Sequence, residues 1–169
     1  MRQRLIGFLL FICLIIFLLY SGYQLYYLDK VFFFCPIEYK QNTIIIRHDS
    51  YGSGDFLAER NGARKHNGID LQADIGTAVY AVRGGRITEA KFHKGLGNYV
   101  ELRHPEGYVS IYAHLSKIEV RKNQSVRQGR KIGEVGKTGN ASYRGIIPHL
   151  HFELRHNDTP LDPMKFLEA

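Results

Sequence analysis

The residues whose types and spacing most clearly suggest chemistry are His149 and His151, which are separated by a single leucine. They lie in an apolar segment that runs from Ile146 to Leu154. Residues i and i+2 of a strand project from the same face, so an extended segment would direct both imidazoles into one space. This arrangement suits one metal ligand beside one group that transfers protons. Because H-x-H patterns also occur by chance in strands, the meaning of this pair depends on partners elsewhere in the chain.

A second segment supplies partners of suitable chemistry. His66 and Asp70 are four residues apart and share the same parity in an extended segment, whereas the Asn-Gly step between them disfavours a helix. Two imidazoles and one carboxylate can form a tetrahedral zinc site with one open position, which is the form that catalytic sites take. The open position holds a water whose pKa the metal lowers toward neutrality. One histidine of the H-x-H pair would then remain as a non-ligand.

A third segment, the expected strand from Tyr108 to Leu115, contains Tyr112 and His114. These two residues have the same parity and are expected to point the same way. An imidazole beside the metal can accept a proton from water, and a second imidazole or a tyrosine hydroxyl can donate to a developing oxyanion. Tyr112 is therefore a candidate oxyanion or substrate contact, although a strand tyrosine more often serves in packing. For His114 the alternative is a core histidine hydrogen-bonded under a loop.

Length and composition limit the remaining possibilities. The chain has 169 residues, enough for one ordinary domain, and a formal net charge of +7 that suits anionic partners. Its two cysteines, Cys13 and Cys35, precede the expected domain, which excludes a disulfide framework and a cysteine-based zinc site there. The other four histidines, at positions 48, 93, 104 and 156, have no comparable context and are expected at the surface or in loops.

The N-terminal segment has the pattern of a membrane anchor. Residues 1–4 form a basic head, and residues 5–28 contain no charged side chain, which is long enough to span a bilayer as a helix. A cleaved signal peptide is the alternative, but no small-x-small cleavage site follows the apolar run. Arg2 and Arg4 predict a cytoplasmic N-terminus and place the remainder outside the inner membrane.

The rest of the chain is expected to be a connector, residues 29–42, followed by one domain, residues 43–169. Short β-type runs alternate with glycine turns, which predicts an all-β, mostly antiparallel small barrel or sandwich. A short helical turn is expected at residues 163–167. The expected strands are residues 43–47, 69–72, 78–82, 85–92, 98–104, 108–115, 131–135 and 150–155.

The three segments together resemble a known family. Their motifs occur in the order His66-x(3)-Asp70, Tyr112-x-His114-Leu-Ser and His149-Leu-His151-Phe-Glu. This combination is similar to the lysostaphin-like (LytM-type) zinc endopeptidases, which cut peptide bonds in peptidoglycan. The similarity covers roughly residues 45–169 and includes the intervening glycine-rich text, such as residues 68–71 and 132–139.

The resemblance implies a role for each motif residue. His66, Asp70 and His151 would bind one zinc ion, and His149 and His114 would be the catalytic histidines that flank the metal water, either of them acting as general base. It also implies a groove for an extended peptide. Residues 140–148 look longer than the family pattern, so the groove wall and the substrate preference there are expected to differ.

The resulting hypothesis is a membrane-anchored zinc endopeptidase that acts on stem or cross-bridge peptides of peptidoglycan. A non-enzymatic LytM-type activator or binding module for other wall hydrolases is the alternative, and the complete ligand set argues against it. A basic run from Lys117 to Lys137 could attract anionic wall polymers or lipid headgroups. Nucleic acid is not expected as a partner, because the predicted topology places the domain outside the cytoplasm.

Overall fold

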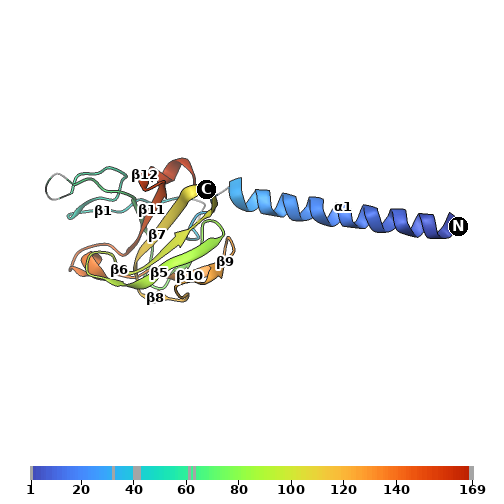
Figure 1. The fold of residues 1–169 in the computed structure, drawn as a ribbon. Coiled ribbons are helices and arrows are strands. Elements are labelled where there is room, and N and C mark those ends of the chain that lie inside the picture. The colour runs from blue at the N-terminus through green and yellow to red at the C-terminus, as the bar shows by residue number, and fades with distance from the viewer. Residues whose placement is uncertain (1, 32, 40–42, 61, 63, 168–169) are drawn as a thin grey trace. The chain divides into compact units, whose positions relative to one another are not determined.

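A computed structural model describes residues 2–31, 33–39, 43–60, 62 and 64–167. The chain divides into two units, the first ending at Phe32 and the second beginning at Phe33. The first unit is the helix α1 (Arg2–Val31), and the second is a β domain (Figure 1). Each unit is described by itself below.

Helix α1 is apolar on all sides. Its segment Ile6–Tyr23 has a mean hydropathy of 2.4 and is not buried against any other part of the protein. A helix of this length and composition suits a membrane span or a signal sequence. The predicted N-terminal apolar helix is therefore present.

The described strands of the domain form a large sheet, a small sheet and a separate two-stranded hairpin, and every pairing between these strands is antiparallel. This confirms the all-β, mostly antiparallel prediction. The large, seven-stranded sheet consists of β3 (Ile69–Gln72), β5 (Gly85–His93), β6 (Gly97–Arg103), β7 (Tyr108–Leu115), β9 (Ser125–Val126), β11 (His149–His156) and β12 (Thr159–Leu161). The small sheet has the order β4 (Ala78–Tyr80), β10 (Lys131–Glu134), β8 (Lys117–Ile118).

Short elements complete the domain. A hairpin of β1 (His48–Asp49) and β2 (Gly52–Ser53) precedes the large sheet. Among the described residues, short 3-10 turns follow at η2 (Pro105–Gly107), η3 (Gly139–Ser142) and η4 (Pro163–Lys165). The last of these is the predicted C-terminal turn. Apolar side chains from both sheets, including Val79 and Ile132 of the small sheet and Leu150 and Phe152 of the large one, share one core.

One predicted strand is not formed. Residues 43–47 make one isolated bridge, between Ile46 and Leu71 of β3, which is flanked by backbone hydrogen bonds from the Arg47 amide to the Asp70 carbonyl and from the Gln72 amide to the Ile45 carbonyl. The reason is that the chain turns after Arg47, whose carbonyl accepts the amide of Gly54 at 2.7 Å, and enters the β1–β2 hairpin. The segment has local β propensity, but no partner strand among the described residues offers it a longer edge.

The domain begins earlier than the predicted boundary at residue 43. Phe33 and Ile37 belong to the core, with exposed fractions of 5% and 2%. Backbone bonds fix the segment, since the Phe34 amide donates to the Val82 carbonyl and the Tyr80 amide donates to the Pro36 carbonyl. Of the predicted connector, residues 29–31 belong to α1 and residues 33–39 are built into the domain.

Strand β11 is the element that positions the site. It pairs with β7 along one edge, and with β3 and β12 along the other, as the central strands of Figure 1 show for β12, β11 and β7. In this register His151 lies opposite Asp70 of β3 and opposite Ala113 of β7. Residues from three distant segments are thereby brought to one point.

Candidate metal centre

Three predicted ligands meet at the junction of β11 and β3. Nε2 of His66, Oδ1 of Asp70 and Nδ1 of His151 are separated by 2.9 to 3.1 Å from one another. All three residues are buried. Zinc bonds of about 2.0–2.1 Å in a tetrahedron require ligand atoms roughly 3.3 Å apart, so these separations fit a single zinc ion.

The approach of His66 to this point depends on a glycine. A Cβ atom at Gly68 would lie 2.2 Å from the carbonyl oxygen of Phe152 in β11. Only glycine therefore allows the segment between His66 and Asp70 to lie against β11. The glycine of the Asn-Gly step, which disfavours a helix in the sequence, is therefore also required for packing against β11.

The hydrogen bonds of the two ligand histidines leave lone pairs facing the centre. Nδ1 of His66 lies 2.8 Å from the carbonyl oxygen of Asp55, and Nε2 of His151 lies 3.0 Å from Oε1 of Glu153. Because oxygen acceptors require N–H groups at these nitrogens, the opposite nitrogens of the neutral rings carry lone pairs. With Oδ1 of Asp70, three electron-pair donors converge, and this donor set fits a divalent cation such as zinc.

The electrostatics also favour positive charge between these groups. Burial opposes a charge on His151, but hydrogen bonds to Asp70 and Glu153 outweigh it and raise the pKa of His151 to about 9. Burial likewise opposes the charge of Asp70, yet the two histidines hold the pKa of its carboxyl well below the usual range. The site thus stabilises positive charge at this point together with the ionised carboxylate of Asp70.

Side chains outside the ligand set hold it in place. Oδ2 of Asp70 accepts hydrogen bonds from Arg47 at 2.9 Å and from Arg60 at 3.2 Å. Glu153, which orients His151, is held in turn by Arg155, whose Nε lies 2.9 Å from Oε2. Parity could have indicated Glu153, because it lies two residues after His151 on the same strand. No sequence signal links Arg47 or Arg60 to Asp70, since their positions depend on loops.

The remaining two predicted histidines lie beside the ligands. Nε2 of His149 is 3.9 Å from Oδ1 of Asp70, and the ring centroid of His114 is 5.0 Å from that of His149 and 5.8 Å from that of His151. Nδ1 of His149 donates to the Ile147 carbonyl at 2.7 Å, and Nδ1 of His114 donates to the Thr138 carbonyl at 2.9 Å. Each Nε2 therefore carries a lone pair in the neutral ring.

Both of these histidines are neutral at neutral pH. Burial, together with the nearby His151 and His149, lowers the pKa of His114 to about 3. Burial also lowers the pKa of His149. Neutral imidazoles with a free lone pair are suited to accept a proton.

The parity argument was wrong for Tyr112 and His114, which do not point the same way. His114 has a φ of 63°, a left-handed conformation that interrupts the alternation of β7 and turns its ring toward His151. Tyr112 is fully buried on the opposite face, against Phe152. Its hydroxyl accepts the Val82 amide and a hydrogen bond from the Ser110 hydroxyl. It is a packing residue there and does not line the cleft described next.

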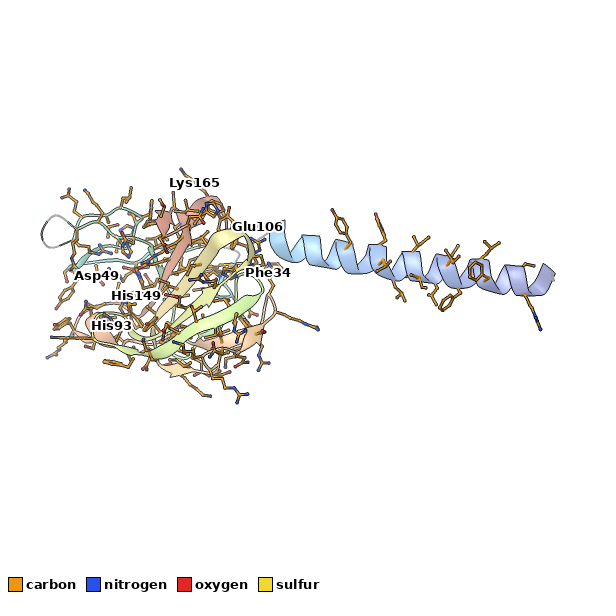
Figure 2. All side chains as sticks on the ribbon, in the orientation of Figure 1. Phe34, Asp49, His93, Glu106, His149 and Lys165 are labelled. Carbon is orange, nitrogen blue, oxygen red and sulfur yellow. The ribbon has the colours of Figure 1, made fainter. Side chains whose placement is uncertain are left out.

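The centre lies in an open cleft of about 710 Å³. Three ligands and both neighbouring histidines line it, together with Arg60 and Arg64. The predicted variable wall, residues 140–148, does contribute to this lining through Asn140, Ala141, Tyr143 and Ile146. In Figure 2, Asp49, His93 and His149 lie toward one side of the domain, and Phe34 and Glu106 lie toward the other.

That wall is held by the β1–β2 hairpin. Oδ2 of Asp49 accepts the amide of Ile147 at 3.0 Å, and the hydroxyl of Tyr51 donates to the carbonyl of Arg144 at 2.8 Å. Oδ1 of Asp49 also lies 2.6 Å from Nη1 of Arg47, which binds Asp70. A continuous chain of polar contacts therefore joins the wall to a metal ligand.

Comparison with known proteins agrees with this geometry. The model of peptidase family M23 matches residues 64–163, which are more than half of the chain. Peptidoglycan DD-endopeptidase ShyA of Vibrio cholerae is 43% identical over 100 residues, which are 59% of this chain and 22% of ShyA. Murein hydrolase activator NlpD of Escherichia coli is 36% identical over 103 residues, which are 60% of this chain and 26% of NlpD. The chain thus matches well under half of the length of either relative.

A solved structure supports the same assignment. A zinc-containing peptidase from Vibrio cholerae superposes with a TM-score of 0.63 and 34% identity, over 81% of this chain and 40% of that one. The match includes the sheets that carry the three motifs, because it extends over most of the domain. The chain therefore belongs to peptidase family M23, with His66, Asp70 and His151 as its zinc-binding triad.

Proposed function

We propose that this protein is a zinc-dependent endopeptidase that hydrolyses peptide bonds in stem or cross-bridge peptides of peptidoglycan. The observation that carries the proposal is the convergence of three buried lone-pair donors, with two neutral histidines beside them, in an open cleft. The substrate class follows from family membership and from the similarity to ShyA.

The metal ligands and the two flanking histidines have different chemical roles. A zinc ion, when bound to His66, Asp70 and His151, supplies Lewis acidity and lowers the pKa of a water molecule. Nε2 of His149 or of His114 takes a proton from the attacking water as the C–O bond forms. The same proton passes to the leaving nitrogen as the C–N bond breaks, which yields one carboxylate and one amine.

The N-terminal apolar helix supports a location for this activity at the membrane. Helix α1 would anchor the protein in the inner membrane, with Arg2 and Arg4 on the cytoplasmic side and the domain outside. Anionic wall polymers or lipid headgroups would be further partners of the basic segment Lys117–Lys137, where Arg121, Arg127 and Arg130 are exposed.

A non-enzymatic activator is the second candidate, because NlpD, which is named as an activator, is 36% identical to this chain over 103 residues. The complete triad and both flanking histidines favour the enzyme. An activator would stimulate another wall hydrolase whether or not His151 is present, so adding the His151→Ala variant to such a hydrolase separates the two functions.

The direct test uses the purified full chain in detergent with defined cross-linked muropeptides and mass spectrometry of the products. Zinc-loaded protein is expected to cleave the cross-link, and chelation or His151→Ala is expected to abolish cleavage. Failure of the zinc-loaded wild type to cleave any of the cross-linked substrates would overturn the proposal.

A further inference from the structure

A smaller chamber adjoins the catalytic cleft. It has a volume of about 320 Å³ and is lined by Tyr51, Glu59, Arg60 and Arg64. Three of these residues, Tyr51, Arg60 and Arg64, also line the main cleft. A peptide that occupies the cleft can therefore extend a side chain or a terminus into the chamber.

Most of the charges around this chamber are already neutralised. Arg47 and Arg60 both bind Asp70, and Arg47 also pairs with Asp49. Glu59, at the chamber wall, pairs with Lys65 at 3.0 Å. These contacts account for the carboxylates of Asp49, Glu59 and Asp70.

Arg64 is the exception. It is exposed, and no carboxylate among the described residues pairs with its guanidinium. Its charge acts on Arg60, whose pKa is lowered by burial and by the positive charges of Arg47 and Arg64. Arg47 and Arg60 use the carboxylates of Asp49 and Asp70, and neither carboxylate pairs with Arg64. One unit of positive charge at the entrance of the chamber is left for a ligand.

The side chain types define that ligand. A guanidinium presents parallel N–H donors that match both oxygens of a carboxylate. Tyr51, whose side chain is half exposed and whose hydroxyl binds the Arg144 carbonyl, lines the same chamber. The metal triad and the two flanking histidines do not use Arg64, so its charge is not needed to build the centre.

We infer that Arg64 binds a carboxylate of the substrate in the chamber beside Tyr51, so that the cleft selects acidic peptides over their amidated counterparts. This inference rests on the proposed function, because it assigns a specificity determinant to the same cleft. The inferred contact requires a free carboxylate on the peptide, because a neutral peptide would gain no affinity from Arg64.

The test compares two muropeptides that differ only in whether their free carboxylates are converted to carboxamides. For the zinc-loaded full chain, kcat/KM is expected to be about tenfold higher for the acidic peptide, the size of one charge-assisted hydrogen bond. Arg64→Gln is expected to remove this preference by lowering kcat/KM for the acidic peptide alone. Arg64→Lys, which keeps the charge without the paired donors, should fall between them.

The matched control is Arg103→Gln, which removes an exposed arginine from β6 and should leave both rates unchanged. Equal loss on both peptides in Arg64→Gln, or a wild type without preference, would overturn the inference. Calorimetric binding of the acidic peptide separates it from the proposed function. If no peptide is cleaved but Arg64→Gln still weakens binding about tenfold, the carboxylate site stands and the enzymatic proposal fails; unchanged binding rejects the site.

Discussion

At the metal centre, four buried imidazoles meet, and an oxygen acceptor fixes one nitrogen of each. Backbone carbonyls serve His66, His114 and His149, whereas a carboxylate, that of Glu153, serves His151. The remaining nitrogen of each neutral ring therefore carries a lone pair. The types and order of the histidines could be predicted from sequence, but their tautomers could not, because three of the acceptors are main-chain carbonyls whose positions depend on the fold of loops.

The contact of Glu153 with His151 predicts a loss of metal affinity when it is removed. Glu153→Ala is expected to weaken zinc binding about 10- to 100-fold, because the acceptor that orients the ligand ring is lost. Glu153→Gln keeps an acceptor oxygen and should lose less. Competition with a zinc chelator measures the affinity, and Glu119→Gln, which removes a partly exposed carboxylate that pairs with Lys117 and Lys131, is the control. Equal affinities in wild type and Glu153→Ala would show that the contact has no such role.

The position of His104 was predicted wrongly from the sequence. It was expected at the surface but is 4% exposed, with Nδ1 at 3.0 Å from the Gly84 carbonyl and Nε2 at 2.8 Å from the Ser110 hydroxyl. Burial, with a further contribution from the charge of Arg83, lowers its pKa to about 4 from 6.5. Nothing in the sequence around Pro105 distinguishes this buried network from an exposed turn.

This burial predicts a pH dependence of stability. Between about pH 6.5 and 4 the unfolded chain binds a proton at His104 that the folded chain excludes, so the stability contributed by neutral His104 is complete above 6.5 and is lost as pH falls. The loss is about 3 kcal/mol in the free energy of unfolding. Denaturant unfolding across this range should show a shallower decline for His104→Gln than for wild type. His48→Gln, an exposed histidine, should leave the slope unchanged; a slope unchanged in His104→Gln would contradict the account.

Among the elements, strand β11 determines the site through its register. The expected strand 150–155 and the observed β11 differ by one residue at each end, and the predicted strands 69–72 and 108–115 match β3 and β7. The alternation of side chains along a strand correctly predicted that His149 and His151 face one cleft. It failed at His114, because one residue with positive φ reverses the face of its side chain. Periodicity alone contains no signal for such a residue.

The β1–β2 hairpin is an element that sequence patterns did not predict. Its two strands have two residues each, too short for alternation to be recognised. Asp49 and Tyr51 of this hairpin bind the backbone on either side of Gly145 and so restrain the cleft wall. The hairpin therefore sets the position of the wall relative to the metal centre.

This restraint predicts a protease-sensitive variant. Tyr51→Phe removes only the hydroxyl that binds the Arg144 carbonyl, so trypsin is expected to cleave after Arg144 faster than in wild type. Global stability should fall by only about 1 kcal/mol, the usual net contribution of one hydrogen bond. Tyr143→Phe, an exposed tyrosine of the same wall, is the matched control. Equal cleavage rates in wild type and Tyr51→Phe would show that the bond does not restrain the wall.

In the whole molecule, the segment after the apolar helix is part of the domain. Phe33 packs edge-on against Tyr108 and Phe166, and the guanidinium of Arg83 lies 5.3 Å from its ring centroid. Composition predicted the apolar N-terminal helix correctly but not this docking, because the run of phenylalanines suits a bilayer surface and a protein core equally. The site and the segment around Phe34 lie on different sides of the domain (Figure 2).

Two neighbouring phenylalanines test this docking. Phe33→Ala is expected to lower the free energy of unfolding by about 3–5 kcal/mol, because it empties a buried site. Phe34→Ala, which truncates a ring that is 54% exposed, should change it by less than about 0.5 kcal/mol. Thermal and denaturant unfolding of the full chain in detergent measure both. Similar effects of the two substitutions would contradict the packing of Phe33.

The central claim is that His151 binds the metal and His149 moves protons. Zinc content and muropeptide turnover of His151→Ala and His149→Ala, measured side by side with wild type, test it most directly. His151→Ala should lose both zinc and turnover, whereas His149→Ala should retain one zinc ion per chain and lose about 10²- to 10⁴-fold in kcat. Loss of zinc from His149→Ala, or full turnover in it, would contradict this division between the two histidines.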